Sequence, residues 1–186
     1  IDGKKRDTSG RFLFPIFNEG DLEDMFIKAL GRFRFELCRT IQGTAWNNIK
    51  EKSLTSEYVD YIQFYRKNRE LSEEKREKIK IQIQKARNNM REVFLIDYTL
   101  WIKNESQGSI KLNKLAREIL STYCPFGKPI RERIRLQPLF EESMARFHRE
   151  KLKKVREYDL RIRALKKEGI EIPPEIEETQ IYYRDL

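Results

Sequence analysis

The stretch between Pro138 and Gly169 constrains the fold most, because it contains neither proline nor glycine and is dense in charge. Proline is favoured at the first position of a helix and glycine just past its end, so these two residues predict the limits of one long helix. Apolar residues recur three and four positions apart from Val155 to Leu165. A stripe this narrow predicts packing on a single partner helix rather than burial in a broad core.

Four further segments show helical periodicity or a helix start signal: residues 21–41, 56–71, 72–101 and 111–123. Asp21 is predicted to cap the first helix, and Ser72 is predicted to cap the third, which no proline or glycine interrupts up to Trp101. One apolar stripe runs along the first helix and consists of Leu22, Phe26, Leu30, Phe33 and Leu37. Residues 124–138 carry three prolines and one glycine and are predicted to form a loop.

These signals predict an all-α protein with one helical domain, long charged helices and an extended arm at each end. The predicted boundaries are residues 1–20 for the N-terminal arm, 21–168 for the helical domain and 169–186 for an extended acidic tail. The N-terminal arm contains the segment FLFPIF (residues 12–17), which is too short for a helix and is expected to lie extended across its own core or a partner. The tail contains Pro173 and Pro174.

The residue types needed for catalysis or metal binding are scarce. His148 is the only histidine and has no serine or cysteine nucleophile in a recognisable motif beside it. Cys38 and Cys124 lie far apart, which argues against zinc and against a disulfide framework. No glycine-rich phosphate loop and no apolar run of about 18 residues occurs. We therefore expect no enzymatic activity, no catalytic residue, no metal, no cofactor, no small-molecule substrate and no transmembrane segment.

Positive charge is the stronger signal. The net charge is +9, and it is segregated: residues 141–168 hold ten Lys and Arg against six acids, whereas residues 170–186 hold five acids against Arg184. Basic helices neutralise phosphates without reading a base sequence, although a solvated helix face with internal ion pairs explains the same pattern. The residues predicted to contact RNA or an acidic partner are Lys128, Arg131, Arg133, Arg135, Lys153, Lys154 and Arg156.

Apolar and aromatic residues outside the core predict protein docking. The long last helix and both arms fit a subunit that threads along a larger assembly, because such elements bury area only against neighbours. The residues predicted to dock on protein are Phe12, Phe14, Phe17, Tyr158, Ile162, Leu165, Tyr182 and Tyr183.

Short motifs within residues 26–158 resemble the regulator-of-G-protein-signalling (RGS) homology domain, an all-helical fold. The sequence YIQFY at residues 61–65 is similar to the aromatic helix of that family, and Trp101 to the aromatic that ends a later helix. SIKLNKLARE at residues 109–118 is similar to the joint that follows, including its Arg-Glu pair, and LFEES at residues 139–143 to the last motif. The resemblance implies a helix–loop–helix joint in which Trp101, Ile110 and Leu112 anchor the core.

RGS domains accelerate GTP hydrolysis by a Gα subunit through two asparagines and one acidic residue. The matching positions of this chain are Lys111 for the joint asparagine, with Asn113 two residues away, the vicinity of Tyr61 for the other, and the vicinity of Lys154 for the acid. The resemblance therefore implies docking rather than GTPase activation.

Three functional hypotheses follow. The first is a non-catalytic, basic structural subunit of a ribonucleoprotein such as a mitochondrial ribosome, which binds protein subunits and contacts RNA phosphates without sequence specificity. The second is an RGS-like domain that binds Gα, and the third is a protein-only scaffold in a membrane-associated complex. The expected location is intracellular: the mitochondrial matrix for the first hypothesis, the cytoplasm otherwise.

Overall fold

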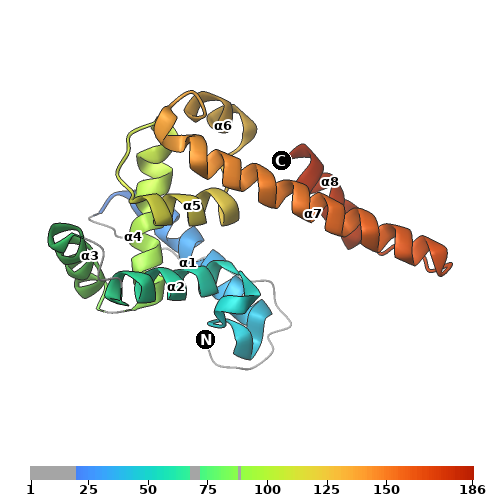
Figure 1. The fold of residues 1–186 in the computed structure, drawn as a ribbon, viewed down its shortest axis with the longest axis horizontal. Coiled ribbons are helices and arrows are strands. Elements are labelled where there is room, and N and C mark those ends of the chain that lie inside the picture. Colours follow the sequence, from blue (N-terminus) through green and yellow to red (C-terminus); the bar gives the residue numbers. More distant parts are fainter. Residues whose placement is uncertain (1–19, 68–71, 88) are drawn as a thin grey trace.

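The computed structural model describes residues 20–67, 72–87 and 89–186. In this part of the chain eight α-helices and four short 3-10 helices occur and no strand, so the predicted all-α single domain is confirmed (Figure 1). Phe12, Phe14 and Phe17, and nearly all of the predicted N-terminal arm, lie outside the described residues.

The first helix, α1 (Leu22–Gln42), begins where predicted, because Asp21 Oδ1 accepts a hydrogen bond of 2.9 Å from the backbone N–H of Glu23. Its apolar stripe does not face the core. The buried residues of α1 are Ile27, Gly31 and Phe35, and they pack against α4 (Met90–Lys103). The helix therefore has two apolar faces, of which the narrower one packs on α4.

The predicted long helix over residues 72–101 is wrong at its centre. It is divided into α3 (Glu73–Lys85) and α4 by a turn in which Arg87 has a φ of 52°. The side chain of Asn89 then caps α4 by accepting a hydrogen bond of 3.0 Å from the backbone N–H of Arg91. An asparagine competes for backbone hydrogen bonds in a helix interior and is favoured at its start, which explains the division.

The core is built where α4 crosses α2 (Leu54–Lys67) and α5 (Lys114–Tyr123). Trp101 is fully buried, stacks on Phe126 at 4.0 Å and donates a hydrogen bond of 2.9 Å to the carbonyl oxygen of Cys124. Leu112 is also buried, whereas Ile110 is exposed. Trp101 and Leu112 thus anchor the joint as predicted, and Ile110 does not.

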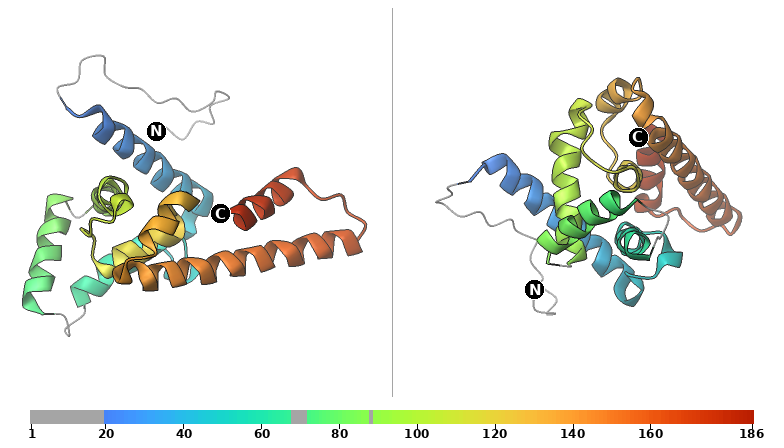
Figure 2. Two further views of the ribbon diagram at one scale, coloured as in Figure 1. Left: turned by 90° about the horizontal axis from the view of Figure 1, so that it is seen from above. Right: turned by 60° about the vertical axis from the view of Figure 1, so that its left-hand side comes forward.

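The C-terminal region differs from the predicted extended tail. Residues 128–134 of the expected loop form α6 (Lys128–Ile134), and Pro138 opens a 3-10 turn that leads directly into α7 (Glu141–Lys167). After Gly169, whose φ is 69°, the chain reverses into α8 (Pro174–Asp185), which runs back along α7 (Figure 2). The tail is helical because Pro174 occupies the first helical position and acidic Glu175 and Glu177 lie in the first turn, where both features stabilise a helix.

Candidate nucleic-acid interface

The start of α7 packs on α5, and the rest of α7 projects from the body with α8 along one side (Figures 1 and 2). The contact between the two helices centres on buried Ile162 and Ile176. Tyr158 stacks on Tyr183 with ring centres 5.9 Å apart, and Asp159 pairs with Arg184 at 2.9 Å. The predicted partner of the narrow stripe is therefore a helix of the same chain.

This packing corrects the predicted docking surface of α7. Ile162 is buried inside the hairpin, Tyr158 and Leu165 are half-buried, and Tyr183 is half-buried against Tyr158. These side chains are already used within the protein, because α8 is helical rather than extended. Among the predicted docking residues of this region only Tyr182 is exposed.

The opposite side of α7 carries a line of cations, which we call the α7 basic stripe. Its members follow one another at spacings of four, three, seven and four, which places them on one helix face, away from buried Phe147 and Ile162. At about 1.5 Å per residue the stripe is about 27 Å long. The stripe consists of Arg149, Lys153, Arg156, Arg163 and Lys167, all exposed.

The charges of the stripe are largely uncompensated. Of its five members, only Lys153 forms an ion pair within the described residues, with Glu150 at 3.9 Å. No acid lies on the face itself, where Leu152 and Leu160 fill the spaces between the cations and are 56% and 64% exposed. Acids do lie three or four residues from three of the cations, but Glu157 pairs with Lys154 and Asp159 with Arg184, so neither acid forms an ion pair with the stripe.

The other predicted basic residues are of three kinds: exposed, paired with an acid, and buried. Lys128, Arg133 and Arg135 are exposed, and Arg133 donates a hydrogen bond of 2.6 Å to the carbonyl oxygen of Ser106. Lys154 pairs with Glu157 at 2.8 Å, and this hydrogen bond raises the pKa of the ammonium group.

Arg131 is a correction, because it is only 9% exposed. Its guanidinium lies 4.8 Å from the ring centre of Phe147 and donates a hydrogen bond to the carbonyl oxygen of Phe126. A buried guanidinium that is already bonded inside the protein has no free face for a phosphate. Its role is to hold α6 against α7.

Positive charge also surrounds the base of α7. His148 is exposed, and its pKa is lowered first by partial burial and then by Lys151, Arg131 and Arg135. Arg135 therefore lies close enough to α7 to add to the field at the beginning of the stripe. At neutral pH His148 is neutral and adds no charge of its own.

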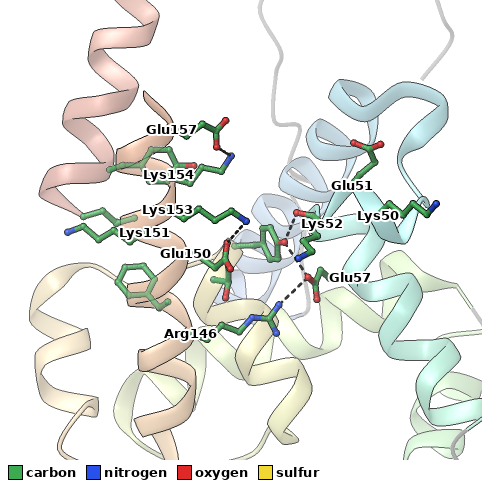
Figure 3. Close-up of a pocket in the computed structure, with 15 residues that line it drawn as sticks. Lys50, Glu51, Lys52, Glu57, Arg146, Glu150, Lys151, Lys153, Lys154 and Glu157 are labelled. Atoms are coloured by element: carbon green, nitrogen blue, oxygen red, sulfur yellow. Dashed lines mark hydrogen bonds and ion pairs between the residues drawn. The ribbon is translucent and has the colours of Figure 1, made fainter. Parts of the chain in front are cut away.

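A cleft of about 330 Å³ opens on the flank of the stripe, between α7, the end of α5, the C-terminal end of α8 and the start of α2 (Figure 3). At its floor Arg146 bridges two acids, with distances of 3.1 Å to Glu57 and 3.3 Å to Glu118. Tyr123 donates a hydrogen bond of 2.5 Å to the carbonyl oxygen of Lys52. The floor is thus a closed polar network, and at the rim Lys153 and Lys154 pair with Glu150 and Glu157.

The rim charges are mixed. Six cations and four glutamates line the cleft, and Lys153 belongs both to the rim and to the stripe. In Figure 3 the side chain of Lys153 reaches toward Glu150, while Lys50 and Lys151 point away from the centre. This arrangement is better suited to contact with an extended anionic partner than to the enclosure of a small molecule. The described residues contain no group of three His, Cys, Asp or Glu side chains that could hold a metal ion.

Comparison with known proteins places the chain in a family. Residues 43–183 match the family described as Domain of unknown function (DUF8509). The chain belongs to the DUF8509 family. The DUF8509 match includes α2 to α7 and most of α8, and so contains the whole basic stripe, whereas α1 precedes it. No curated protein and no solved structure matches the chain. Within the described residues no helix has the length and apolar character needed to cross a membrane.

Arg149, Arg163 and Lys167 were missed by sequence reasoning, although a signal for them exists. They lie half a turn away from the apolar residues Tyr158, Ile162 and Leu165, so the helical spacing places them together on the opposite face of the helix. A count of charges along the chain does not separate the cations of this face from those on the sides of the helix, which are paired with acids.

Proposed function

We propose that the protein is a non-catalytic docking subunit that binds the phosphate backbone of RNA through the α7 basic stripe. The observation that carries this proposal is a row of five exposed cations on one face of a projecting helix, without an acid on that face. A ribonucleoprotein such as a mitochondrial ribosome is the assembly that suits this surface, and it would place the protein in the mitochondrial matrix.

The stripe supports backbone contact rather than base reading. Lysine and arginine release condensed counterions when they neutralise phosphates, and this provides affinity that does not depend on base sequence. Exposed Leu152 and Leu160 between the cations add apolar contact for sugars and bases. The helix is held in place from behind by α8 and by α5, so the cations need little ordering when RNA binds.

The test is a filter-binding titration of the full chain with single-stranded RNA over a range of salt concentrations. We expect log affinity to fall linearly with log salt. Replacing Arg149, Arg156 and Arg163 with Gln should lower the slope by about 2, because each phosphate contact on a single strand contributes about 0.7. Over one decade of salt that change corresponds to roughly 100-fold in affinity.

The matched control removes the same charge from another helix. Lys78, Lys80 and Lys85 on α3 are exposed, and replacing them with Gln should leave the slope almost unchanged. Equal losses in the two variants would mean that net charge alone is responsible. Absence of RNA binding at low salt would contradict the proposal and leave two alternatives: a Gα-binding domain and the protein-only scaffold of a membrane-associated complex.

Binding to a Gα subunit is the second candidate, supported by the joint that resembles the RGS domain. Trp101 and Arg117 are buried at this joint, and Asn113 both caps α5 and donates a hydrogen bond of 2.8 Å to Tyr61. Tyr61 itself is buried, which does not suit a partner contact at that position. Pull-down with Gα in its transition-state-mimic form separates this candidate from RNA binding, since only a Gα-binding domain would be retained.

A further inference from the structure

A second group of cations lines a cleft beside α1. The cleft has a volume of about 510 Å³ and opens between α1, the turn that joins α3 to α4, and the first turns of α4. We call it the α1–α4 cleft. It is separate from the α7 basic stripe, because α3 and the projecting end of α7 lie at opposite ends of the molecule (Figures 1 and 2). Its charged lining consists of five cations and one acid: Lys28, Arg32, Lys85, Arg87, Arg91 and Glu92.

The cations reach the α1–α4 cleft from separate elements. Lys28 and Arg32 lie one turn apart on α1 and are both exposed. Lys85 ends α3, Arg87 lies in the turn that follows, and Arg91 lies in the first turn of α4. Charges of one sign that line a cleft reinforce one another's field and attract an anion into it.

The single acid of the lining is shared between two arginines. Arg91 pairs with Glu36 at 3.0 Å and with Glu92 at 3.3 Å. Glu92 also lies 3.8 Å from Arg32, which is a weaker contact. Because a guanidinium group has five N–H donors, both arginines keep donors for a further acceptor.

The remaining cations have a distant acidic partner or none. Lys28 lies 3.9 Å from Asp24, and about half of its side chain is exposed. Lys85 and Arg87 are exposed, and neither forms an ion pair within the part of the chain that the structure describes. Arg87 also has a φ of 52°, a conformation that is uncommon for arginine and that recurs at ligand sites.

The floor of the α1–α4 cleft is apolar. Ala86 and Leu95 are buried, and Ile96 is half-buried. Leu95 is also the side chain that approaches α1 at Gly31, so the crossing of α1 and α4 holds this floor in place. An apolar floor under a few convergent polar groups, in a volume of this size, is typical of a small-molecule site.

We propose that the α1–α4 cleft binds a nucleoside diphosphate, with the two phosphates on the cations and the nucleoside against the apolar floor. Two phosphate groups carry about three to four negative charges near neutral pH, and the lining carries a net charge of +4. Arginine recognises phosphate through two parallel hydrogen bonds, and lysine adds a point charge. An acidic peptide would spread its charges over about 3.5 Å per residue, whereas the convergent cations suit a compact anion.

The test is isothermal titration calorimetry of the full chain with ADP at low salt and without RNA. We expect saturable binding of ADP, about tenfold weaker binding of AMP because one phosphate is missing, and no binding of adenosine. Equal affinity for AMP and ADP, or no binding at about 1 mM ADP, would overturn the proposal. Pyrophosphate should bind about threefold more weakly than ADP, and equal affinity would overturn the role of the floor.

A charge-matched pair of variants assigns the binding to the cleft. Arg32→Gln combined with Arg87→Asn should weaken ADP binding about tenfold. Asparagine tolerates a positive φ better than arginine does, so the turn is preserved. Lys78→Gln combined with Lys80→Gln removes the same charge from α3 outside the lining and should leave the affinity unchanged. Equal losses in the two variants would mean that net charge alone attracts ADP.

Glu92→Gln separates loss of the site from loss of folding. The substitution removes the acid of the lining and releases its contacts with Arg32 and Arg91, so ADP should bind about threefold more tightly. Unchanged or weaker binding would contradict the proposal, and misfolding cannot produce the expected gain. The inference does not rest on RNA binding by α7: single-stranded RNA should not displace ADP, and displacement would show that the cleft is part of the RNA-binding surface instead.

Discussion

At the scale of single residues, a buried ion pair determines how the joint after α4 folds. Glu105 is fully buried, and its carboxylate accepts hydrogen bonds from the backbone N–H groups of Lys111 and Leu112 at 2.8 and 2.7 Å. Arg117 donates to the same carboxylate at 2.7 Å and lies 5.3 Å from the ring centre of Phe140. The glutamate thus replaces a turn of backbone hydrogen bonds, and the arginine balances its charge.

Arg117→Ala should cost about 3–5 kcal/mol of the free energy of unfolding, because it leaves the Glu105 carboxylate buried without its counter-ion. Urea denaturation followed by circular dichroism measures this change. Arg146→Ala is the matched control: Arg146 also pairs with two acids, but it is partly exposed, so we expect a loss of about 1 kcal/mol. Equal losses in both variants would show that burial of the Glu105–Arg117 pair does not increase its contribution to the free energy of unfolding.

The two thiols differ in environment and should differ in reactivity. Burial raises the pKa of Cys124 to about 12, and partial burial also raises the pKa of Cys38. A raised pKa lowers the thiolate fraction at a given pH, so both thiols should react more slowly than a free cysteine, and the rate should rise with pH. In the native protein we expect DTNB to modify Cys38 first and Cys124 only after urea unfolding. Rapid reaction of the native Cys38→Ser variant would contradict this order.

Residue-scale features were only partly predictable from sequence. Asp21 as a helix cap follows from local chemistry and is confirmed. The roles of Glu105 and Arg131 do not, because a charged residue in a polar segment is indistinguishable from a surface residue until the chain folds around it. Arg117, the partner of Glu105, lies against Phe140, and Arg131 lies against Phe147, so both environments depend on rings that come later in the chain.

At the scale of elements, the crossing of α1 and α4 depends on the absence of a side chain at Gly31. A Cβ at this position would lie 2.8 Å from Leu95 Cδ2 and 2.9 Å from Tyr98 Cδ1. Glycine is ordinarily unfavourable in a helix interior, and the close approach of α4 gives the physical reason for it here. The close approach also explains why Ile27 and Phe35, rather than the larger apolar stripe, face α4.

Gly31→Ala should destabilise the protein by about 1–3 kcal/mol through overpacking. This loss outweighs the gain of about 1 kcal/mol that alanine provides in an unconstrained helix. Gly127→Ala is the control, since its φ is −59° and a Cβ there would only make an ordinary contact with Pro129. Thermal unfolding of both variants measures the difference, and a stabilised Gly31→Ala variant would mean that α1 and α4 separate easily.

The α7–α8 hairpin should open without unfolding the core. Its contact contains the buried residues Ile162 and Ile176, which are not part of the core cluster around Trp101 and Phe94. We expect Ile176→Ala to raise hydrogen exchange in residues 174–185 at least tenfold and to leave exchange in α4 unchanged. The same measurement on Val93→Ala, a core substitution, should raise exchange throughout. Uniform acceleration by Ile176→Ala would show instead that the hairpin unfolds together with the core.

Sequence patterns predicted most helices but missed their partners. The spacing alone predicts the apolar face of α7 that contains Tyr158, Ile162 and Leu165. Whether this face packs on α8 or on another protein depends on the conformation of residues 174–185. Prolines 173 and 174 favoured an extended tail in the sequence, although a proline at the first helical position is equally compatible with a helix. The division at Arg87 was missed because no proline or glycine marks it.

At the scale of the whole molecule, charge is separated by face as well as by segment. The five cations of the α7 basic stripe are about 4–10 Å apart along the helix axis, within or near the screening length of about 10 Å at 0.1 M salt. They therefore repel one another when no anionic partner is present. The acidic residues of α8 offset this only in part, because α8 packs on the face of α7 that contains Tyr158 and Ile162, opposite the stripe.

The same charges should consequently give salt effects of opposite sign. Raising NaCl from 0.02 to 0.5 M should weaken RNA binding, yet stabilise the free protein by roughly 1 kcal/mol, which is about 2–4 °C in Tm for a chain of this size. The variant with Arg149, Arg156 and Arg163 replaced by Gln should be more stable at low salt and should lose most of this dependence, since its stripe retains only two cations. The α3 control variant should keep it, because Lys78 and Lys80 are paired with Glu74 and Glu77. If the stripe and control variants have the same Tm at every salt concentration, the destabilising charge repulsion is distributed over the molecule rather than confined to α7.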